Sequence, residues 1–234
     1  MKKVIVLGGS GAGMVAASVA MKLPDVEFLG FLNHNLEKGD TVGDFKKLPV
    51  LGKPEDIETF LKEKDTYFFC AYEGIRDPHL SYNLWKELPI PKDRYINLID
   101  PNAVIPEGFV KVGVGVLAAP FVQVSPDAII SDNVMLLGNA FVGHNSFIGE
   151  FSHVTTNSVV GAYVHVGKAV TVGMNSTLLG RVHVGDFTLI GAGSMVTKDV
   201  PNDVIVAGNP AKVLRARGEQ ELNYLKKGER NVNY

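Results

Sequence analysis

The sequence predicts two units in series, a small α/β domain followed by an all-β domain of stacked parallel coils. Three observations predict this order. Up to about residue 98, aliphatic segments alternate with segments of helical spacing, which is typical of an α/β sheet. From residue 112 an apolar residue recurs at every sixth position, a period that no helix or ordinary meander has. Glycine supplies 25 of the 234 residues, without the Gly-X-Y period of collagen.

The elements of the first domain, residues 1–98, can be placed in order. A basic start leads into a strand at Val4–Leu7 and a glycine loop, and apolar residues at helical spacing predict a helix over Met14–Leu23. After these we expect a strand at Val26–Leu32, a polar loop, a short helix at Pro54–Lys62, a strand at Tyr67–Ala71 and a helix at Pro78–Glu87. Strands that alternate with helices predict a parallel sheet.

The glycine loop Gly8–Gly13 lies at a junction between strand and helix, where backbone N–H groups favour anionic ligands. Its spacing is not Gly-x-Gly-x-x-Gly, and the second strand ends in Asn33 and His34 instead of the acidic residue that an NAD ribose requires. A dinucleotide cofactor is therefore disfavoured. Two interpretations stay open, a site for a phosphate-bearing substrate such as a nucleotide-sugar and a tight turn that needs glycine.

The second domain, residues 112–212, follows from the six-residue period. All 15 positions from Val112 to Val196 in steps of six are apolar, and the residues two places before them are small or β-branched. The residue after them is glycine eight times, at Gly113, Gly143, Gly149, Gly161, Gly167, Gly173, Gly185 and Gly191. We expect short strands that point one aliphatic residue inward and turn where glycine relieves backbone strain. Three hexapeptide faces make one coil, and five stacked coils bury one aliphatic column.

Composition excludes several classes of function. Lysine and arginine (23) nearly balance aspartate and glutamate (25), so the chain has no cationic field for nucleic acid. The longest apolar runs are far below the roughly 20 residues of a membrane-spanning helix, and the N-terminus does not resemble a signal peptide. Cys70 alone cannot form an internal disulfide, so we expect a cytoplasmic protein. Residues 213–234 are polar and are expected to form a solvated helical tail.

The repeat resembles the left-handed β-helix of the hexapeptide-repeat acyltransferases, and Val206–Arg215 resembles that family's Gly-x-Pro-Ala-Lys ending. The order of the domains is similar to that of the sialic-acid O-acetyltransferases and UDP-amino-sugar (bacillosamine-type) N-acetyltransferases. It consists of a Rossmann-like domain, a connector at residues 99–111 that continues the junction motif Asn97–Ile105, and a β-helix. The resemblance implies acetyl-CoA as acyl donor, no metal, and an amino or hydroxyl group of a sugar as acceptor. The sugar is expected to be nucleotide-linked, in bacterial surface glycan biosynthesis.

The segment His144–His153 resembles the family motif His-[Asp/Glu]-x-x-Ile-Gly-[Asp/Glu]-x-x-His. The resemblance makes His144 the general base and places His153 against acetyl-CoA of the adjoining chain. These two side chains lie half a coil apart, so they cannot meet across the packed column. A site that uses both lies between subunits, which favours a homotrimer. Asn145 replaces the usual acidic residue, and an amide can orient the imidazole without stabilising its cation as a carboxylate does.

The resemblance also implies contacts for both substrates. Met174 and Ala192, one full coil apart, match positions whose backbone meets the pantetheine arm, beside Gly173 and Gly191. A backbone N–H near Gly161 and Ala162 is the expected oxyanion donor. The substrate-binding positions are Ser10, Gly11, Ala12, Asn33, His34 and Tyr72. Relatives often carry histidine at the position of Ala12 and acidic residues at those of Asn33 and His34, so a different acceptor is expected.

Two other functions remain open from the sequence. The β-helix could serve as a non-catalytic trimeric scaffold for a nucleotide- or sugar-binding domain, or it could carry a metal-dependent hydratase. His165 and His183 lie one full coil apart and should stack on successive coils, which favours a surface ladder over a metal site because a third converging ligand is required. The sequence does not separate N- from O-acetylation, or acetyl from another short acyl group.

Overall fold

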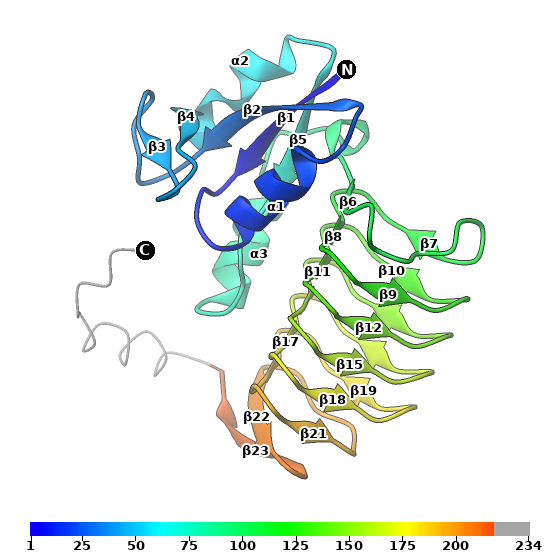
Figure 1. Ribbon diagram of the computed structural model, residues 1–234. Helices are drawn as coiled ribbons and strands as arrows, with labels where there is room; N and C mark the ends of the chain where they lie inside the picture. Colours follow the sequence, from blue (N-terminus) through cyan, green and yellow to red (C-terminus); the bar gives the residue numbers. More distant parts are fainter. Residues whose placement is uncertain (218–234) are drawn as a thin grey trace.

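The computed structural model describes residues 1–217, which form a small sheet domain beside a long stack of coils (Figure 1). The N-terminal sheet has five strands in the order β3-β4-β2-β1-β5. Its strands are β1 Lys2–Leu7, β2 Val26–Leu32, β3 Thr41–Val42, β4 Leu48–Gly52 and β5 Thr66–Cys70, and the helices are α1 Ala12–Ala20, α2 Ile57–Leu61 and α3 Pro78–Lys86. Short 3-10 turns occupy Pro54–Asp56 and Lys92–Arg94.

This sheet is not wholly parallel, which corrects the expectation of a parallel sheet. β1 runs parallel to β2 and β5, and β2 runs parallel to β4, but β3 pairs antiparallel with β4. Both β3 and β4 lie in the segment expected to be a polar loop. The sequence signal failed because β3 has two residues and β4 contains Pro49 and Gly52, which weaken the pattern of a strand.

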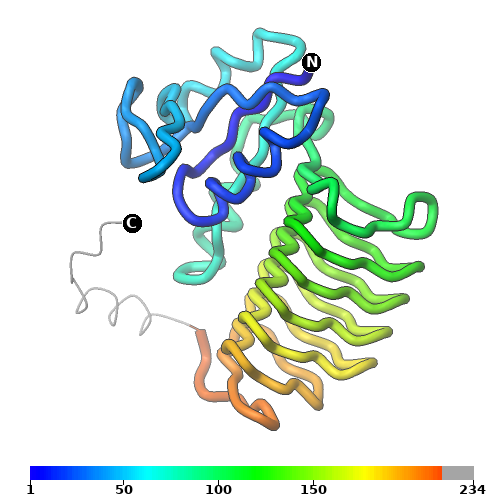
Figure 2. Tube along the Cα trace, in the orientation of Figure 1, coloured from blue at the N-terminus to red at the C-terminus, as the bar shows by residue number. Residues whose placement is uncertain are grey.

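Residues 111–196 form 15 two-residue strands, one for each hexapeptide, so the predicted period and its stacking are confirmed (Figure 2). These strands are β7 Lys111–Val112, β8 Leu117–Ala118, β9 Gln123–Val124, β10 Ile129–Ile130, β11 Met135–Leu136, β12 Phe141–Val142, β13 Phe147–Ile148, β14 His153–Val154, β15 Val159–Val160, β16 His165–Val166, β17 Thr171–Val172, β18 Thr177–Leu178, β19 His183–Val184, β20 Leu189–Ile190 and β21 Met195–Val196. Each pairs in parallel with the equivalent strand of the next coil, which gives three sheets around one core.

The core of the stack is an aliphatic column with small polar residues beside it. The second residue of each strand points inward, and Ile148, Val154 and Val166 are fully buried. Ser152 occupies the neighbouring inward position, where its hydroxyl donates to the carbonyl of Gly167 at 2.8 Å and accepts from the N–H of Val170 at 3.0 Å. The interior therefore tolerates serine because its hydroxyl bridges to the next coil.

The role expected for the repeat glycines is wrong. None of the eight has a left-handed backbone; the left-handed residue lies two positions further on, as at Asn145 (φ 57°) and Phe151 (φ 59°). Glycine is needed for a different reason. A Cβ on Gly149 would lie 2.5 Å from the backbone of Gly167 on the next coil. The coils approach one another too closely at these corners for any side chain.

Both ends of the repeat extend the stack. Before it, β6 Leu98–Ile99 pairs with β8, and Val104 bridges to Gln123, so the connector winds as one more irregular coil. After it, β22 Val204–Gly208 joins β20 and turns back as β23 Ala211–Ala216. Residues 213–216 are thus in a strand, where we expected the start of a helical tail. The rest of that expected tail lies outside the described residues.

The N-terminal domain packs on the outer face of the sheet that contains β8, β11 and β14 (Figure 1). Apolar residues of α1, including Ala16 and Val19, share a core with Leu117 and Met135. From α3, the Trp85 ring stacks on Phe151 with centroids 5.4 Å apart. Within residues 1–217, no helix combines the length and the apolar composition needed to cross a membrane.

Candidate functional site

His144 stands at the corner between β12 and β13, with its side chain exposed. Its Nδ1 lies 2.8 Å from Oδ1 of Asn145. Because an amide oxygen only accepts, this contact requires the proton on Nδ1 and leaves the lone pair of the neutral ring on Nε2. That is the tautomer in which Nε2 can accept a proton. Asn145 has the left-handed backbone of a corner residue, a conformation that asparagine tolerates well.

The next coil supplies a backbone group and an aromatic ring beneath His144. Ala162 belongs to the equivalent corner of that coil, and its nitrogen is only 2.7 Å from the position of a Cβ on Gly143. The N–H of Tyr163 donates to the carbonyl of His144 at 3.0 Å, and its ring meets the imidazole edge to face at 5.1 Å. The Arg181 guanidinium lies 4.6 Å from the centre of that ring. The sequence patterns did not point to Tyr163 and Arg181, although both repeat the position of Asn145 on the two coils that follow.

The residues expected to meet the pantetheine arm occupy another corner of the prism, which for Met174 lies between β17 and β18. Met174 follows β17 and is 54% exposed, and its carbonyl accepts from the N–H of Gly193 beside Ala192 one coil later. A Cβ on Gly173 would lie 2.5 Å from the carbonyl of Ile190, whereas one on Gly191 would press on Ala207 at 2.8 Å. The structure therefore places Met174 and Ala192 together on successive coils and leaves their corner open.

His153 differs from the surface residue that the resemblance implies. It lies in β14 between Met135 and Thr171 of the flanking strands, 3% exposed, on the face that the N-terminal domain covers. Burial lowers the pKa of its imidazole to about 4, so the ring is neutral at pH 7. Its Nε2 has no hydrogen-bond partner within the part of the chain that the structure describes. The ring is enclosed by its own chain, and nothing among residues 1–217 brings it to His144.

The expected substrate residues of the N-terminal domain converge at the carboxyl ends of β1, β2 and β5. His34 Nε2 lies 3.1 Å from the hydroxyl of Tyr72, and Asn33 lies against Gly9. The Asn33 side chain also accepts from the N–H groups of Asn35 and Leu36. Ligands of parallel sheets commonly bind at this edge. The structure thus brings together residues from three loops that lie far apart in the sequence.

A pocket of about 640 Å³ opens beside the glycine loop, where Ser10 and Gly11 line it. The other wall is the loop after β5, with Glu73, Ile75, Arg76 and Asp77. This wall could not be predicted from the sequence, because a short polar loop carries no periodic signal. Burial raises the pKa of the Glu73 carboxyl. Ala12, in contrast, is 4% exposed and packs its methyl group into the core, so its side chain does not face the pocket.

The histidine ladder forms as expected. His165 and His183 stack with centroids 4.6 Å apart and planes 9° apart, and Phe147 stacks on His165 at 4.7 Å. The nitrogen lone pairs of an imidazole lie in the plane of the ring, so two rings in parallel planes do not aim them at a common point. Across residues 1–217, no group of three or more histidine, cysteine, aspartate or glutamate residues has an arrangement that could hold a metal ion.

Comparison with known proteins identifies the class. No protein-family model matches the chain. It is 28% identical over 136 residues to the putative acetyltransferase YvoF of Bacillus subtilis. The matched region covers 58% of this chain and 78% of that protein. It is 30% identical over 95 residues to the galactoside O-acetyltransferase of Escherichia coli, 41% of this chain and 47% of the relative. The chain spans about half the length of the serine acetyltransferases that it matches. With its repeat architecture, the chain is similar to the hexapeptide-repeat acetyltransferases, and these relatives indicate an acyltransferase that uses acetyl-CoA.

Two solved structures resemble nearly the whole chain. PerB from Caulobacter crescentus, in complex with CoA and GDP-perosamine, superposes with a TM-score of 0.76 at 25% identity, over 91% of this chain and 97% of that one. The acetyltransferase domain of PglB from Neisseria gonorrhoeae, in complex with acetyl coenzyme A, has a TM-score of 0.76 at 22% identity, over 91% and 99% of the two chains.

Proposed function

We propose that the protein transfers an acetyl group from acetyl-CoA to an amino or hydroxyl group of a nucleotide-linked sugar, in bacterial surface glycan biosynthesis. The observation that carries the proposal is the His144–Asn145 pair, which holds Nε2 of His144 ready to accept a proton one coil above the backbone of Ala162. PerB, which binds CoA and a GDP-linked sugar, supports the choice of substrates.

The proposed reaction is an acyl transfer in which His144 is the base. Nε2 of His144 takes the proton of the acceptor amine or hydroxyl as that group attacks the thioester carbon. The N–H of Ala162 stabilises the oxyanion that forms. Collapse of the tetrahedral intermediate breaks the carbon–sulfur bond, and the proton on His144 passes to the departing thiolate. Met174 and Ala192, beside Gly173 and Gly191, are proposed to line the path of the pantetheine arm.

We also propose that the active unit is a homotrimer of left-handed β-helices, each with a Rossmann-like acceptor-binding domain. The N-terminal domain covers the sheet that contains β14, whereas His144 lies at the opposite edge of the triangular prism, between β12 and β13. The acceptor pocket of one chain and its own base therefore lie on opposite sides of a packed core. A neighbouring subunit that supplies the base would complete the site.

Thiol release tests the proposal with acetyl-CoA and a panel of nucleotide-linked amino and hydroxy sugars. Wild-type protein is expected to release CoA only with a matching acceptor, and His144→Ala to lose about 10²- to 10⁴-fold in kcat. His183→Ala is a matched control, because this exposed histidine lies in β19, away from the corner of His144, and should leave the rate unchanged. Binding of CoA without transfer to any acceptor would contradict the proposal and favour a scaffold.

A further inference from the structure

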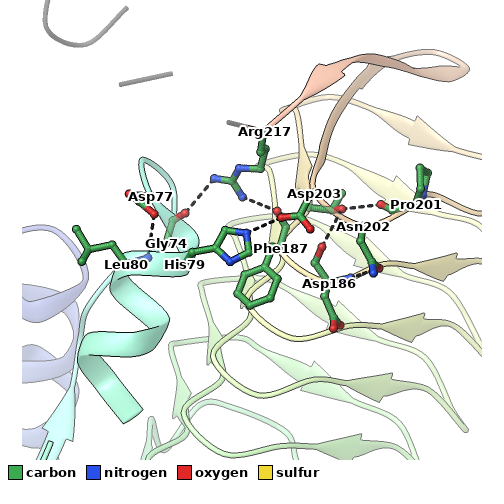
Figure 3. A network of polar contacts seen from close by, with 11 residues as sticks. Gly74, Asp77, His79, Leu80, Asp186, Phe187, Pro201, Asn202, Asp203 and Arg217 are labelled. Carbon is green, nitrogen blue, oxygen red and sulfur yellow. Dashed lines mark hydrogen bonds and ion pairs between the residues drawn. The ribbon is translucent and has the colours of Figure 1, made fainter. Parts of the chain in front are cut away.

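The loop that lines the acceptor pocket is attached to the far end of the coil stack (Figure 3). Arg217, which is 8% exposed, follows β23 and reaches back to the N-terminal domain. Its guanidinium donates to the carbonyl of Gly74 at 3.0 Å and to that of Ile75 at 2.6 Å. It also donates to the carbonyl of Phe187 at 3.2 Å. One side chain thus connects two consecutive peptide groups of the loop with the β-helix.

A second contact lies beside the first. His79, at the start of α3, places Nε2 2.5 Å from Oδ1 of Asp203, which comes just before β22. The imidazole stacks on Phe187 with centroids 3.8 Å apart and planes 20° apart. The backbone N–H of Arg217 donates to the carbonyl of Asp203 at 2.7 Å, so both contacts belong to one unit. We refer to His79, Phe187, Asp203 and Arg217 as the clamp.

The same short loop, residues 73–77, contacts the clamp on one side and lines the pocket on the other. Gly74 and Ile75 turn their carbonyls toward Arg217, while the neighbouring residues Glu73 and Arg76 line the pocket. The loop is also fixed within its own domain, since Ser81 donates to the carbonyl of Glu73 and Asp77 caps α3 by accepting from Leu80. These local bonds fix the two ends of the loop. Its middle, at Gly74 and Ile75, is held by a residue from the other end of the described chain.

We propose that the clamp residues are positioning residues for the acceptor, which fix loop 73–77 so that Glu73 and Arg76 meet the sugar and phosphate groups of the nucleotide-linked substrate. A carboxylate and a guanidinium in one wall suit hydroxyls and phosphate respectively. The inference rests on the proposed function and deepens it. It predicts that the last coil controls acceptor binding, although no clamp residue lines the pocket.

Steady-state kinetics of Arg217→Gln, Arg217→Lys and His79→Gln test the clamp. Loss of two hydrogen bonds to the loop should raise the acceptor KM about tenfold in Arg217→Gln, with the acetyl-CoA KM unchanged. Arg217→Lys can still donate to one carbonyl and should recover part of the loss. Lys92→Gln is the control, because it breaks another ion pair between the two parts, Lys92–Asp132 at 2.7 Å, away from the loop.

Hydrogen exchange of the amides of Leu80 and Ser81, which donate to Asp77 at the end of the loop, provides a readout independent of activity. Exchange should accelerate about tenfold in Arg217→Gln and stay unchanged in Lys92→Gln. Unchanged exchange together with an unchanged acceptor KM would overturn the clamp, as would equal rises in the KM of both substrates. A wild-type protein that acetylates no sugar would instead remove the proposed function, and the exchange result would still decide whether the clamp holds the loop. If Arg217→Gln does not fold, the same measurements on His79→Gln test the clamp, because His79 is partly exposed.

Discussion

Nδ1 of His144 and Oδ1 of Asn145 lie 2.8 Å apart, and Asn145 is at the same time the left-handed residue of its corner. The same residue, Asn145, therefore forms the turn of the backbone and orients the imidazole of the proposed base. Asparagine tolerates the left-handed region because its amide bonds locally, and that same amide fixes which imidazole nitrogen carries the proton. The replacement of an acidic residue by Asn145 keeps the orientation of the ring and omits the negative charge.

Restoring the carboxylate should change the pH dependence of the reaction. In Asn145→Asp, a negative charge beside the ring stabilises the imidazolium, so the acid limb of the kcat/KM profile should move to higher pH by about one unit. Profiles of both proteins between pH 5 and 9 measure the shift. The same acid limb in both proteins would show that His144 does not act as the base.

The buried imidazole of His153 should make stability depend on pH. Its folded pKa of about 4 lies below the ordinary value of 6.5, so the unfolded chain binds the extra proton between these values. The contribution is fully present above pH 6.5 and falls as the pH drops toward 4. Between pH 7 and pH 5 the free energy of unfolding should decrease by about 2 kcal/mol more in wild type than in His153→Gln. Urea denaturation at both pH values tests this, and equal decreases would contradict the burial.

Alanine should distinguish the two kinds of glycine on the coils. In Gly149→Ala the new methyl group would meet the backbone of Gly167 at 2.5 Å, so the free energy of unfolding should fall by about 1–3 kcal/mol. Gly138→Ala is the matched control, since its nearest neighbour, the carbonyl of Pro120, is 3.5 Å away. Thermal unfolding should show a lower Tm for the first variant alone. Equal effects would mean that coil spacing is not the constraint.

The ion pair between Lys22 and Asp100 should stabilise the junction of the two domains. Asp100 is fully buried, and Lys22 Nζ lies 2.7 Å from its carboxylate. Burial alone would raise the pKa of Asp100, but hydrogen bonds from Lys22 and Asn102 outweigh it and hold that pKa below its usual value. Lys22→Met should therefore cost about 2 kcal/mol in unfolding free energy.

Lys2→Met, which removes a pair with Asp25 at 3.9 Å on the surface, serves as the control for that substitution. Exposed ion pairs contribute little, so its unfolding midpoint in urea should match that of the wild type. If Lys2→Met lost as much unfolding free energy as Lys22→Met, the loss in Lys22→Met would come from the change in net charge and not from the buried ion pair.

The sequence predicts most of the architecture because the repeat is local. Each hexapeptide places one aliphatic residue inward, so Val112 to Val196 could be assigned without knowledge of long-range contacts. The burial of His153 could not be predicted, since it depends on a domain that packs on β14 from another part of the chain. The same holds for Glu73 and Arg76, which become a pocket wall only through tertiary packing. The reason for glycine at the corners was also missed, because backbone approach between coils leaves no mark in composition.

The N-terminal domain is attached at both ends of the stack, covalently at β6 before the first coil and through Arg217 after the last one. The number of coils therefore determines whether Arg217 lies within reach of the N-terminal domain. Successive coils lie about 4.8 Å apart, so a sixth coil of perfect hexapeptides would fold equally well and yet carry Arg217 beyond reach of Gly74 and Ile75. The length of the β-helix, which its own packing leaves open, is set by the domain that lies along it.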